Sequence, residues 1–196
     1  MATNEPVRER ILDAAVSVLV EVGRPSTKLL SSVAERAGVS RPTIYRHVGS
    51  QTDLFEALIR REVERRVTAD ILPALGRLEN PREDFARSLE VMIRMVADHP
   101  VVQFVVRESP ATVAKQLDNF APILTEAVVP IVQPVFDEAI RAGRIRPVDV
   151  SAIVLWGARI AVSREAIPVA GNTGDIRAEV EQLFEVAAII GTLPAS

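Results

Sequence analysis

The segment Val33–His47 constrains the fold of this chain more than any other feature. It predicts two short helices separated by a tight turn at Gly38, because glycine adopts the positive φ that ends a helix. Ser40 is placed to cap the second helix, and Pro42 is tolerated in its first turn. Small Ala34 lets the helices approach closely. The apolar contacts between them come from Val33, Ala37, Val39 and Ile44. The segment therefore predicts a helix-turn-helix.

The second helix of this motif has a polar, basic outer face. The side chains left for the surface are Arg41, Thr43, Tyr45, Arg46 and His47. The window from Arg36 to Thr52 holds three arginines and no acidic residue, so the surface is suited to nucleic-acid phosphates. The alternative is a helical hairpin with a solvated arginine-rich face. Such faces usually mix both signs of charge, and we therefore favour the nucleic-acid interpretation.

Charge is distributed unevenly along the chain. The 196 residues carry a net charge of −3, but residues 1–66 have 11 Lys and Arg against 9 Asp and Glu, whereas residues 67–196 have 12 against 17. A mildly basic N-terminal part on an acidic body fits a single nucleic-acid contact surface. Apolar residues make up 48%, and the mean hydropathy of +0.19 is high for a soluble protein. Self-association is one way to cover the excess apolar surface.

Several classes of site and location are disfavoured by composition. The chain has no cysteine, which excludes disulfides, thiolate metal sites and cysteine nucleophiles. The N-terminus has no apolar signal-peptide core, and no apolar run reaches the roughly 18 residues of a membrane span. We expect a cytoplasmic protein without cofactor or metal.

The pattern along the chain is almost entirely helical. Apolar residues at helical spacing, with glycine and proline boundaries, predict an all-α fold of about nine helices. The longer ones are expected over residues 7–22, 50–71, 81–99, 111–142, 150–163 and 176–190. Pro73 is expected to mark a break, and Pro122, Pro130 and Pro134 to break or kink the fourth of these into pieces. Residues 101–106 are expected to form a short buried helix.

The last two predicted helices are unusually apolar. Residues 150–163 contain a single charge, Arg159, so we expect that helix to be buried on all sides. The next carries a stripe of Ile176, Val180, Leu183, Ala187 and Ile190. A symmetric dimer through a four-helix interface would cover both. The alternative is a monomer in which they complete the core. The interface candidates are Val154, Leu155, Ile160, Val180, Leu183 and Ala187.

With these features in place, the chain resembles the TetR family of transcriptional regulators. The resemblance is specific over about the first 58 residues: Arg8 to Ala15 before Gly23, Val33-Ala34, Ala37 to Ser40, and Thr43 to Val48 followed by Ser50 and Leu54. It implies a helix-turn-helix DNA-binding domain over residues 1–50. It also implies a helical ligand-binding and dimerisation domain over residues 51–196. The function implied is repression of a palindromic operator by a dimer that a small, mainly apolar effector releases.

The resemblance also assigns DNA contacts. It places Arg41, Pro42 and Thr43 where the family approaches bases, and Tyr45 and His47 where it contacts phosphates or base edges. The full set of candidates is Thr27, Lys28, Ser40, Arg41, Pro42, Thr43, Tyr45, Arg46, His47 and Gln51. Four positions depart from the family. Val48 replaces the usual Phe, Gln51 replaces the usual Lys, and Leu29 and Leu30 stand where Thr or Ser is common.

The effector pocket of the family lies among the helices of the body. The resemblance therefore implies that Met92, Met95, Phe104, Phe120, Leu124, Val128, Trp156 and Arg159 are candidate lining residues. Arg159 is a lone charge on an apolar helix, and such a charge requires a partner. It is expected either to bind an acidic group of the ligand or to pair with a carboxylate across the dimer.

An enzymatic function is disfavoured by the residue inventory. The two histidines, His47 and His99, are far apart in sequence. The sequence has no phosphate-binding glycine loop, metal-ligand pair or nucleophile elbow. The second candidate function is a helical dimer that binds lipophilic molecules and has a degenerate DNA-binding head. Val48 and Gln51 favour it, whereas the intact face from Arg41 to His47 opposes it.

Overall fold

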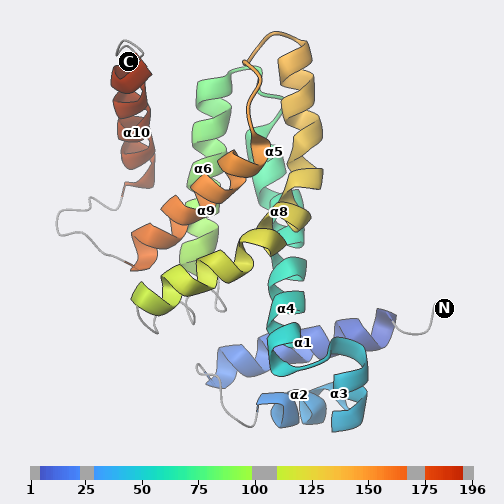
Figure 1. The fold of residues 1–196 in the computed structure, drawn as a ribbon. Coiled ribbons are helices and arrows are strands. Elements are labelled where there is room, and N and C mark those ends of the chain that lie inside the picture. The colour runs from blue at the N-terminus through green and yellow to red at the C-terminus, as the bar shows by residue number, and fades with distance from the viewer. Residues whose placement is uncertain (1–4, 23–28, 99–109, 167–174, 192–196) are drawn as a thin grey trace.

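The computed structural model describes residues 5–22, 29–98, 110–166 and 175–191, all helical or in short turns between helices (Figure 1). The side chains of residues 5, 22, 110–119, 165–166 and 186–191 lie outside this description, as does the helix expected over residues 101–106.

The helices divide between the two ends of an elongated molecule. At one end lie α1 (Glu5–Val22), α2 (Leu29–Ala37) and α3 (Arg41–Val48). From there α4 (Gln51–Arg66) runs through a π-helical turn, η1 (Val67–Ile71), into α5 (Leu72–Leu75). The remainder consists of α6 (Pro81–Asp98), α8 (Pro110–Arg141), α9 (Val150–Ala166) and α10 (Ile176–Gly191). Because α4, η1 and α5 are continuous, the described residues form eight continuous helices, close to the expected nine.

The expected break at Pro73 does not occur. The helix that begins at Gln51 continues through Pro73 to Leu75. The turn just before the proline is widened, and the Leu72 amide donates to the carbonyl of Val67. Proline lacks the amide hydrogen and crowds the carbonyl four residues earlier. A wide π turn at this point accommodates both defects without ending the helix.

Of the two outcomes expected for the prolines in the region 111–142, a break does not occur and a kink does, because α8 is a single helix of 32 residues that changes direction (Figure 1). Pro122, Pro130 and Pro134 are all exposed and lie at intervals of four or eight residues, on one face of the helix. The carbonyls that lose their donors are therefore accessible to water, which lowers the cost of an interior proline. The first and last parts of the helix run in clearly different directions (Figure 1), as proline kinks produce.

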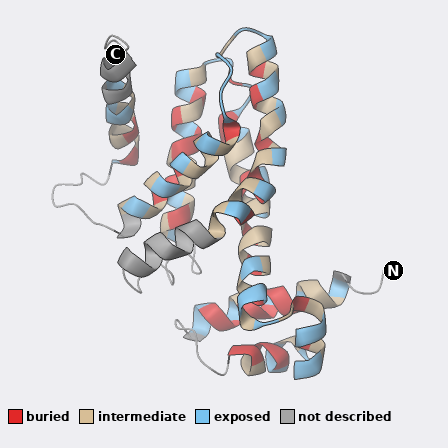
Figure 2. Cartoon of the chain, in the orientation of Figure 1, coloured by how far each residue is buried: buried red, intermediate tan, exposed pale blue. Residues whose placement is uncertain are grey.

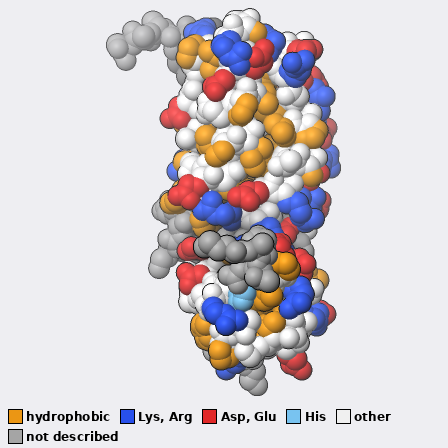
Figure 3. All heavy atoms as spheres, turned by 90° about the vertical axis from the view of Figure 1, so that its right-hand side faces the viewer, with side chains coloured by type: hydrophobic (Ala, Val, Ile, Leu, Met, Phe, Trp, Pro, Cys, Tyr) orange, Lys and Arg blue, Asp and Glu red, His pale blue; other side chains and the backbone are white. Residues whose placement is uncertain are grey.

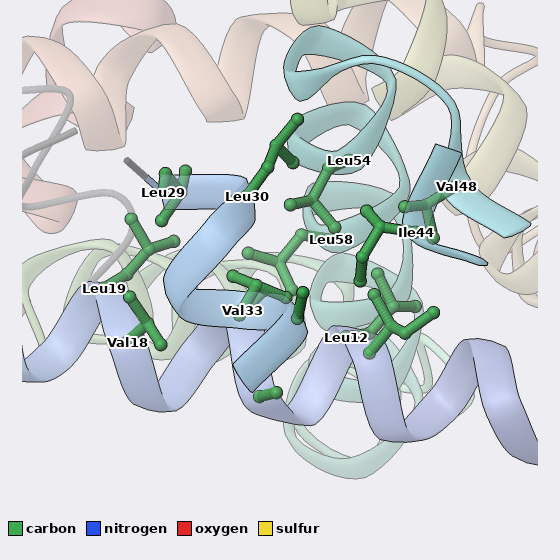
Figure 4. Packing of buried hydrophobic residues seen from close by; sticks show 14 residues of the cluster. Leu12, Val18, Leu19, Leu29, Leu30, Val33, Ile44, Val48, Leu54 and Leu58 are labelled. Carbon is green, nitrogen blue, oxygen red and sulfur yellow. The ribbon is translucent and has the colours of Figure 1, made fainter. Parts of the chain in front are cut away.

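The N-terminal helices have their own hydrophobic core. Helices α1, α2, α3 and the first two turns of α4 enclose it, and Figure 4 shows their side chains converging between the ribbons. Ile11, Leu12, Val33, Ile44 and Leu58 are completely buried there. We call this unit, which includes Leu54 and Leu58 of α4, the head, and the rest of the chain the body.

The body has two separate clusters in place of one core (Figure 2). One lies between η1, α5, α8 and α9, with Val128, Val132 and Phe136 as its α8 members. The other lies between α6, α9 and α10, with Leu89, Ile93 and Val180 at its centre. Helix α9 contributes to both clusters and therefore joins them.

Helix α9 is not buried on all sides, contrary to expectation. Ala152, Trp156, Arg159 and Ser163 are exposed and recur at helical spacing, which defines one open face. The opposite face is tightly packed, because a Cβ added at Gly157 would lie 2.6 Å from Cε of Met92 on α6. In the single chain, α9 therefore has a packed face and an uncovered one.

Helix α10 stands at the edge of the body beside α6 (Figure 1). Its attachment is apolar through Val180 and polar at its edge, where Arg82 of α6 contacts Glu181 at 3.1 Å and Glu185 at 2.6 Å. The same guanidinium lies 5.5 Å from the ring centroid of Phe184, whose ring meets Phe85 edge-on. These contacts leave Leu183 on the outer side, 38% exposed.

One described segment, Phe120–Arg141 of α8, is long and apolar enough to span a membrane by length and composition alone, with a mean hydropathy of 1.3. It is not an uninterrupted apolar run, because Glu126, Asp137 and Glu138 fall within it. Its inner side packs against α9 and η1. Figure 3 shows apolar side chains over the middle of the body and charged side chains toward its ends.

Candidate nucleic-acid interface

The turn between α2 and α3 has the geometry expected from the sequence. Gly38 has a φ of +65°, which a side-chain-bearing residue adopts only with strain. The Val39 amide donates to the Ala34 carbonyl at 2.9 Å, and the Gly38 amide to that of Glu35 at 3.2 Å. These two bonds satisfy the last carbonyls of α2. The chain can thus leave α2 and begin α3 within three residues.

Ser40 caps α3, as predicted. Its side-chain oxygen accepts from the Thr43 amide at 3.3 Å, and Pro42 occupies the first turn. The hydroxyl groups of Ser40 and Thr43 also lie 2.8 Å apart, within hydrogen-bond distance. The cap therefore fixes both the start of α3 and the orientation of the Thr43 hydroxyl.

Helix α3 has one buried and one exposed face. Ile44 and Val48 are buried in the head, whereas Arg41, Pro42 and Arg46 are exposed. Tyr45 is also exposed, at 51% of its surface. Figure 1 shows α2 and α3 at the end of the molecule remote from the body. The predicted polar face of α3 is thus open to solvent at that end.

The arginines of this region are not equivalent. Arg36 of α2 donates to both carboxylate oxygens of Glu21 on α1, with Nη1 at 2.8 Å from Oε1. Through the hydrogen bond with Arg36, this contact lowers the pKa of Glu21. Arg41 and Arg46 make no ion pair within the described part of the chain. The positive charge available to a ligand therefore lies on α3. Of the three arginines between Arg36 and Thr52, Arg36 is neutralised by Glu21, which leaves Arg41 and Arg46.

His47 differs from the exposed residues of α3 because it is half-buried, and its Nδ1 is buried without a hydrogen-bond partner in the part of the chain that the structure describes. It lies at a cleft of about 260 Å³ between the head and α8. The cleft is lined by Arg8, His47, Val48, Asp53, Glu56, Ala57, Arg60 and Ile123. This position is on the flank of the face that carries Arg46.

Two adjacent arginines of α4 pair with different parts of the molecule, one with the head and the other with the body. Arg61 contacts Glu9 at 3.0 Å and Asp13 at 2.9 Å, which holds α4 against α1. Arg60 contacts Glu126 of α8 at 2.6 Å, which links α4 to the body. Sequence analysis missed both roles. The partners are 48 to 66 residues away, and neighbouring arginines on a helix carry no signal that separates them.

The remaining predicted residues are placed as follows. Gln51 is the first residue of α4 and is half-buried. Thr27, Lys28 and Phe104 lie outside the described residues, as does the side chain of Ala187. Within the described residues no group of three or more His, Cys, Asp or Glu side chains is arranged to hold a metal ion.

Among the described residues, the predicted effector-pocket residues lie in different parts of the body. Met92 and Met95 are half-buried in the cluster between α6 and α9, whereas Val128 is buried in the other cluster. Phe120 and Leu124 are half-buried on α8. Trp156 is 44% exposed, and Arg159 is also exposed without an ion pair in the described region. Both lie on the open face of α9 and not in the interior.

Comparison with known proteins identifies the head. Residues 11–58 match the family model for bacterial regulatory proteins of the tetR family. An uncharacterized HTH-type transcriptional regulator of Mycobacterium tuberculosis is 33% identical over 98 residues, which cover 50% of this chain and 48% of that protein. The chain thus spans about half the length of this relative. The HTH-type transcriptional activator FasR of Mycolicibacterium smegmatis is 25% identical over 150 residues, 76% of this chain and 68% of FasR.

Solved structures share the fold of the whole chain. RolR in complex with resorcinol superposes with a TM-score of 0.66 at 17% identity, covering 98% of this chain and 96% of RolR. The TetR-family repressor AlkX from Dietzia sp. strain DQ12-45-1b, implicated in n-alkane biodegradation, gives 0.64 at 20% identity, covering 92% and 95%. Helices α2 and α3 thus form a helix-turn-helix, and residues 11–58, which contain it, are the part of the chain that matches the tetR family of bacterial regulatory proteins.

Proposed function

We propose that this protein is a sequence-specific transcriptional regulator that binds double-stranded DNA through α3. The observation that carries the proposal is the exposed face of Arg41, Tyr45 and Arg46 at the free end of a head with its own core. Neither guanidinium has an acidic partner in the described structure, so both are available to phosphates or guanine edges. Residues 1–50 and the first turns of α4 form the DNA-binding domain, and the rest of 51–196 is the regulatory domain.

The other proposed DNA contacts differ in how directly their positions in the structure support them. Pro42 and Thr43 lie in the first turn of α3, the part of a recognition helix that meets base edges. Ser40 serves as the cap, and Gln51 adds a donor at the start of α4. His47 is restricted to a flank contact with phosphate, because its Nδ1 is buried. Thr27 and Lys28 remain proposals from the family resemblance.

The protein acts as a homodimer in this proposal. One head covers only a few base pairs, so useful affinity requires two heads about 34–36 Å apart on a roughly palindromic operator. Trp156 of α9 and Leu183 of α10 are large exposed apolar residues that a second copy would cover. Leu155 is half-buried beside them. Val154 and Ile160 are half-buried against the chain's own clusters, and fully buried Val180 is excluded from the interface.

A small, mainly apolar effector would bind the body and release the DNA. The buried polar residues described in the body already have partners, since Asp84 contacts Arg87 and Ser88 donates to the Phe85 carbonyl. The fully buried residues described in the body therefore offer no unmatched charge to an ionic ligand, whereas half-buried Arg144 has two guanidinium nitrogens buried without a partner among the described residues. RolR binds resorcinol and AlkX is implicated in alkane metabolism, which supports the same class of ligand. The proposed location is the cytoplasm, the proposed sign of regulation is repression, and no catalytic function is proposed.

Coupling between the two domains would pass through α4. The Arg60–Glu126 contact links α4 to α8, and Arg61 holds α4 to α1. A displacement of α8 on effector binding would therefore be transmitted to the whole head. By linkage, the effector weakens DNA binding by the factor by which DNA weakens effector binding, typically about 5- to 150-fold.

The decisive experiment is fluorescence anisotropy with a duplex taken from upstream of the protein's own coding region. A scrambled duplex is measured beside it at near-physiological salt. We expect saturable binding at least about 10³-fold tighter to the first duplex. The variant Arg46→Ala should weaken binding and reduce the dependence of log K on log salt by about one unit.

The matched control is the double variant Glu21→Ala/Arg36→Ala. It also removes an arginine of the helix-turn-helix, but one whose charge Glu21 already neutralises. Its salt dependence should therefore equal that of the wild type. If Arg46→Ala behaves like this control, Arg46 is not a contact. If both duplexes bind equally weakly, a genomic panel of duplexes follows, and failure there would favour the lipophile-binding dimer with a degenerate head.

A further inference from the structure

The first turn of α3 carries a threonine whose hydroxyl is already engaged. Thr43 Oγ1 lies 2.8 Å from Ser40 Oγ, and the same serine oxygen accepts the Thr43 amide at 3.3 Å. The Thr43 hydroxyl is therefore part of the helix cap. Because Thr43 is half-buried with its oxygen turned back to the cap, the methyl group is what this side chain can offer to a ligand.

The neighbouring groups leave few polar means of base recognition on α3. The helix contains no Asn, Gln, Asp or Glu, the residues that recognise adenine or cytosine edges through amide or carboxylate groups. Between the two arginines it presents the ring of exposed Pro42, the exposed Tyr45 and the Thr43 methyl. In the major groove, thymine is distinguished by its C5-methyl group, and small apolar groups recognise it by contact.

We propose that Thr43 is a specificity-determining residue that recognises a thymine by methyl–methyl contact. The thymine lies next to the base pair that Arg41 approaches, since the two residues share the first turn of α3. The inference rests on the proposed DNA-binding function and adds to it the chemistry of one operator position. It assigns to Ser40 the role of holding the Thr43 hydroxyl away from the base.

The test begins with a duplex selected by the full-length protein from a pool with a random 30-base-pair core. Each thymine of the selected duplex is then replaced in turn by uracil, which pairs identically but lacks the methyl group. Burial of one methyl-sized group corresponds to about fourfold in affinity for one half-site and about 15-fold for both. We expect one thymine position per half-site to show this loss with the wild type.

Two variants separate the methyl group from the hydroxyl. Thr43→Ser keeps the hydroxyl and loses the methyl, so it should bind thymine and uracil duplexes equally. Thr43→Val keeps a methyl and loses the hydroxyl, so it should retain the preference for thymine. Circular dichroism of both variants, with folding equal to that of the wild type, establishes that the comparison is between intact heads.

The other outcomes overturn the inference. Indifference of the wild type to uracil at every position would exclude methyl recognition, and an equal loss in Thr43→Ser would place the contact on another residue. A variant Thr43→Val that loses specific binding while Thr43→Ser keeps it would show that the hydroxyl is the recognising group. Failure to select any duplex would instead count against the proposed function itself.

Discussion

The head and the body of this protein are stabilised in different ways. In the head, short helices surround one core, and their ends are fixed by caps and a glycine turn that involve residues at most five positions apart. In the body, longer helices divide between two clusters, and ion pairs such as Arg60–Glu126 and Arg82–Glu185 join residues 66 and 103 positions apart. The helix ends of the head are specified locally, whereas the packing of the body depends on contacts that no short segment contains.

The two regions also differ in what they leave uncovered. The exposed face of the head is polar and basic, as a surface that meets DNA in water requires. The body leaves Trp156 and Leu183 exposed at 44% and 38%. Water solvates the first kind of surface well, but the second gains free energy when a partner covers it. In the proposed function, the first surface meets nucleic acid and the second meets a copy of the chain.

The largest expected effect concerns the uncovered face of the body. The double variant Trp156→Glu/Leu183→Glu should give monomers in sedimentation velocity, because two charges cannot be buried in an apolar interface without partners. Loss of the second head should weaken specific DNA binding by about 10²–10⁴-fold. The control Val148→Glu changes another exposed apolar residue, 42% exposed in the turn before α9. A double variant that remains dimeric would place the interface elsewhere.

The second prediction tests whether the two regions unfold separately. Ile44 is completely buried in the head, so Ile44→Ala should destabilise that region by about 2–5 kcal/mol. The single tryptophan lies in the body and reports on it alone. In urea, the circular dichroism transition should move to lower concentration while Trp156 fluorescence is unchanged. The body variant Phe136→Ala should instead move the Trp156 fluorescence transition to lower urea concentration. If each variant shifts the circular dichroism and fluorescence transitions together, the head and the body unfold as one unit.

A smaller effect tests the local specification of the head. Ser50 caps α4, and its hydroxyl accepts from the Asp53 amide at 3.2 Å. Ser50→Ala should lower the free energy of unfolding by about 1 kcal/mol, as measured by urea denaturation. Ser17→Ala is the control, since Ser17 is exposed within α1 and bonds only to a carbonyl of its own helix. Equal effects of the two substitutions would argue against the importance of the cap.

The smallest expected effect is a pH dependence of the stabilisation that Asp53 provides. The Ser50 amide and the Ser50 hydroxyl lower the pKa of Asp53 from its usual value of 3.8. Because this pKa is lower in the folded state, the stabilisation is present at neutral pH and disappears as the pH falls through the folded-state pKa. The stability difference between wild type and Asp53→Ala should therefore be constant near neutrality and shrink below pH 3.8. A difference that stays constant in acid would contradict the capping role of this carboxylate.

The candidate site was only partly predictable from the sequence. Exposure of Arg41, Tyr45 and Arg46 followed from helical periodicity and the buried positions of Ile44 and Val48. The neutralisation of Arg36 did not, because Glu21 lies on a different helix. The position of His47 at a cleft depends likewise on how α8 lies against the head.

By itself the sequence determined the all-helical class, the turn at Gly38 and the cap at Ser40. These features act between residues a few positions apart, so the local chain contains all the information. The tertiary structure alone decided that α8 is continuous, that α9 has an open face, and that Arg60 and Arg61 hold different partners. Each of these depends on which helices pack together and which side of each then faces water.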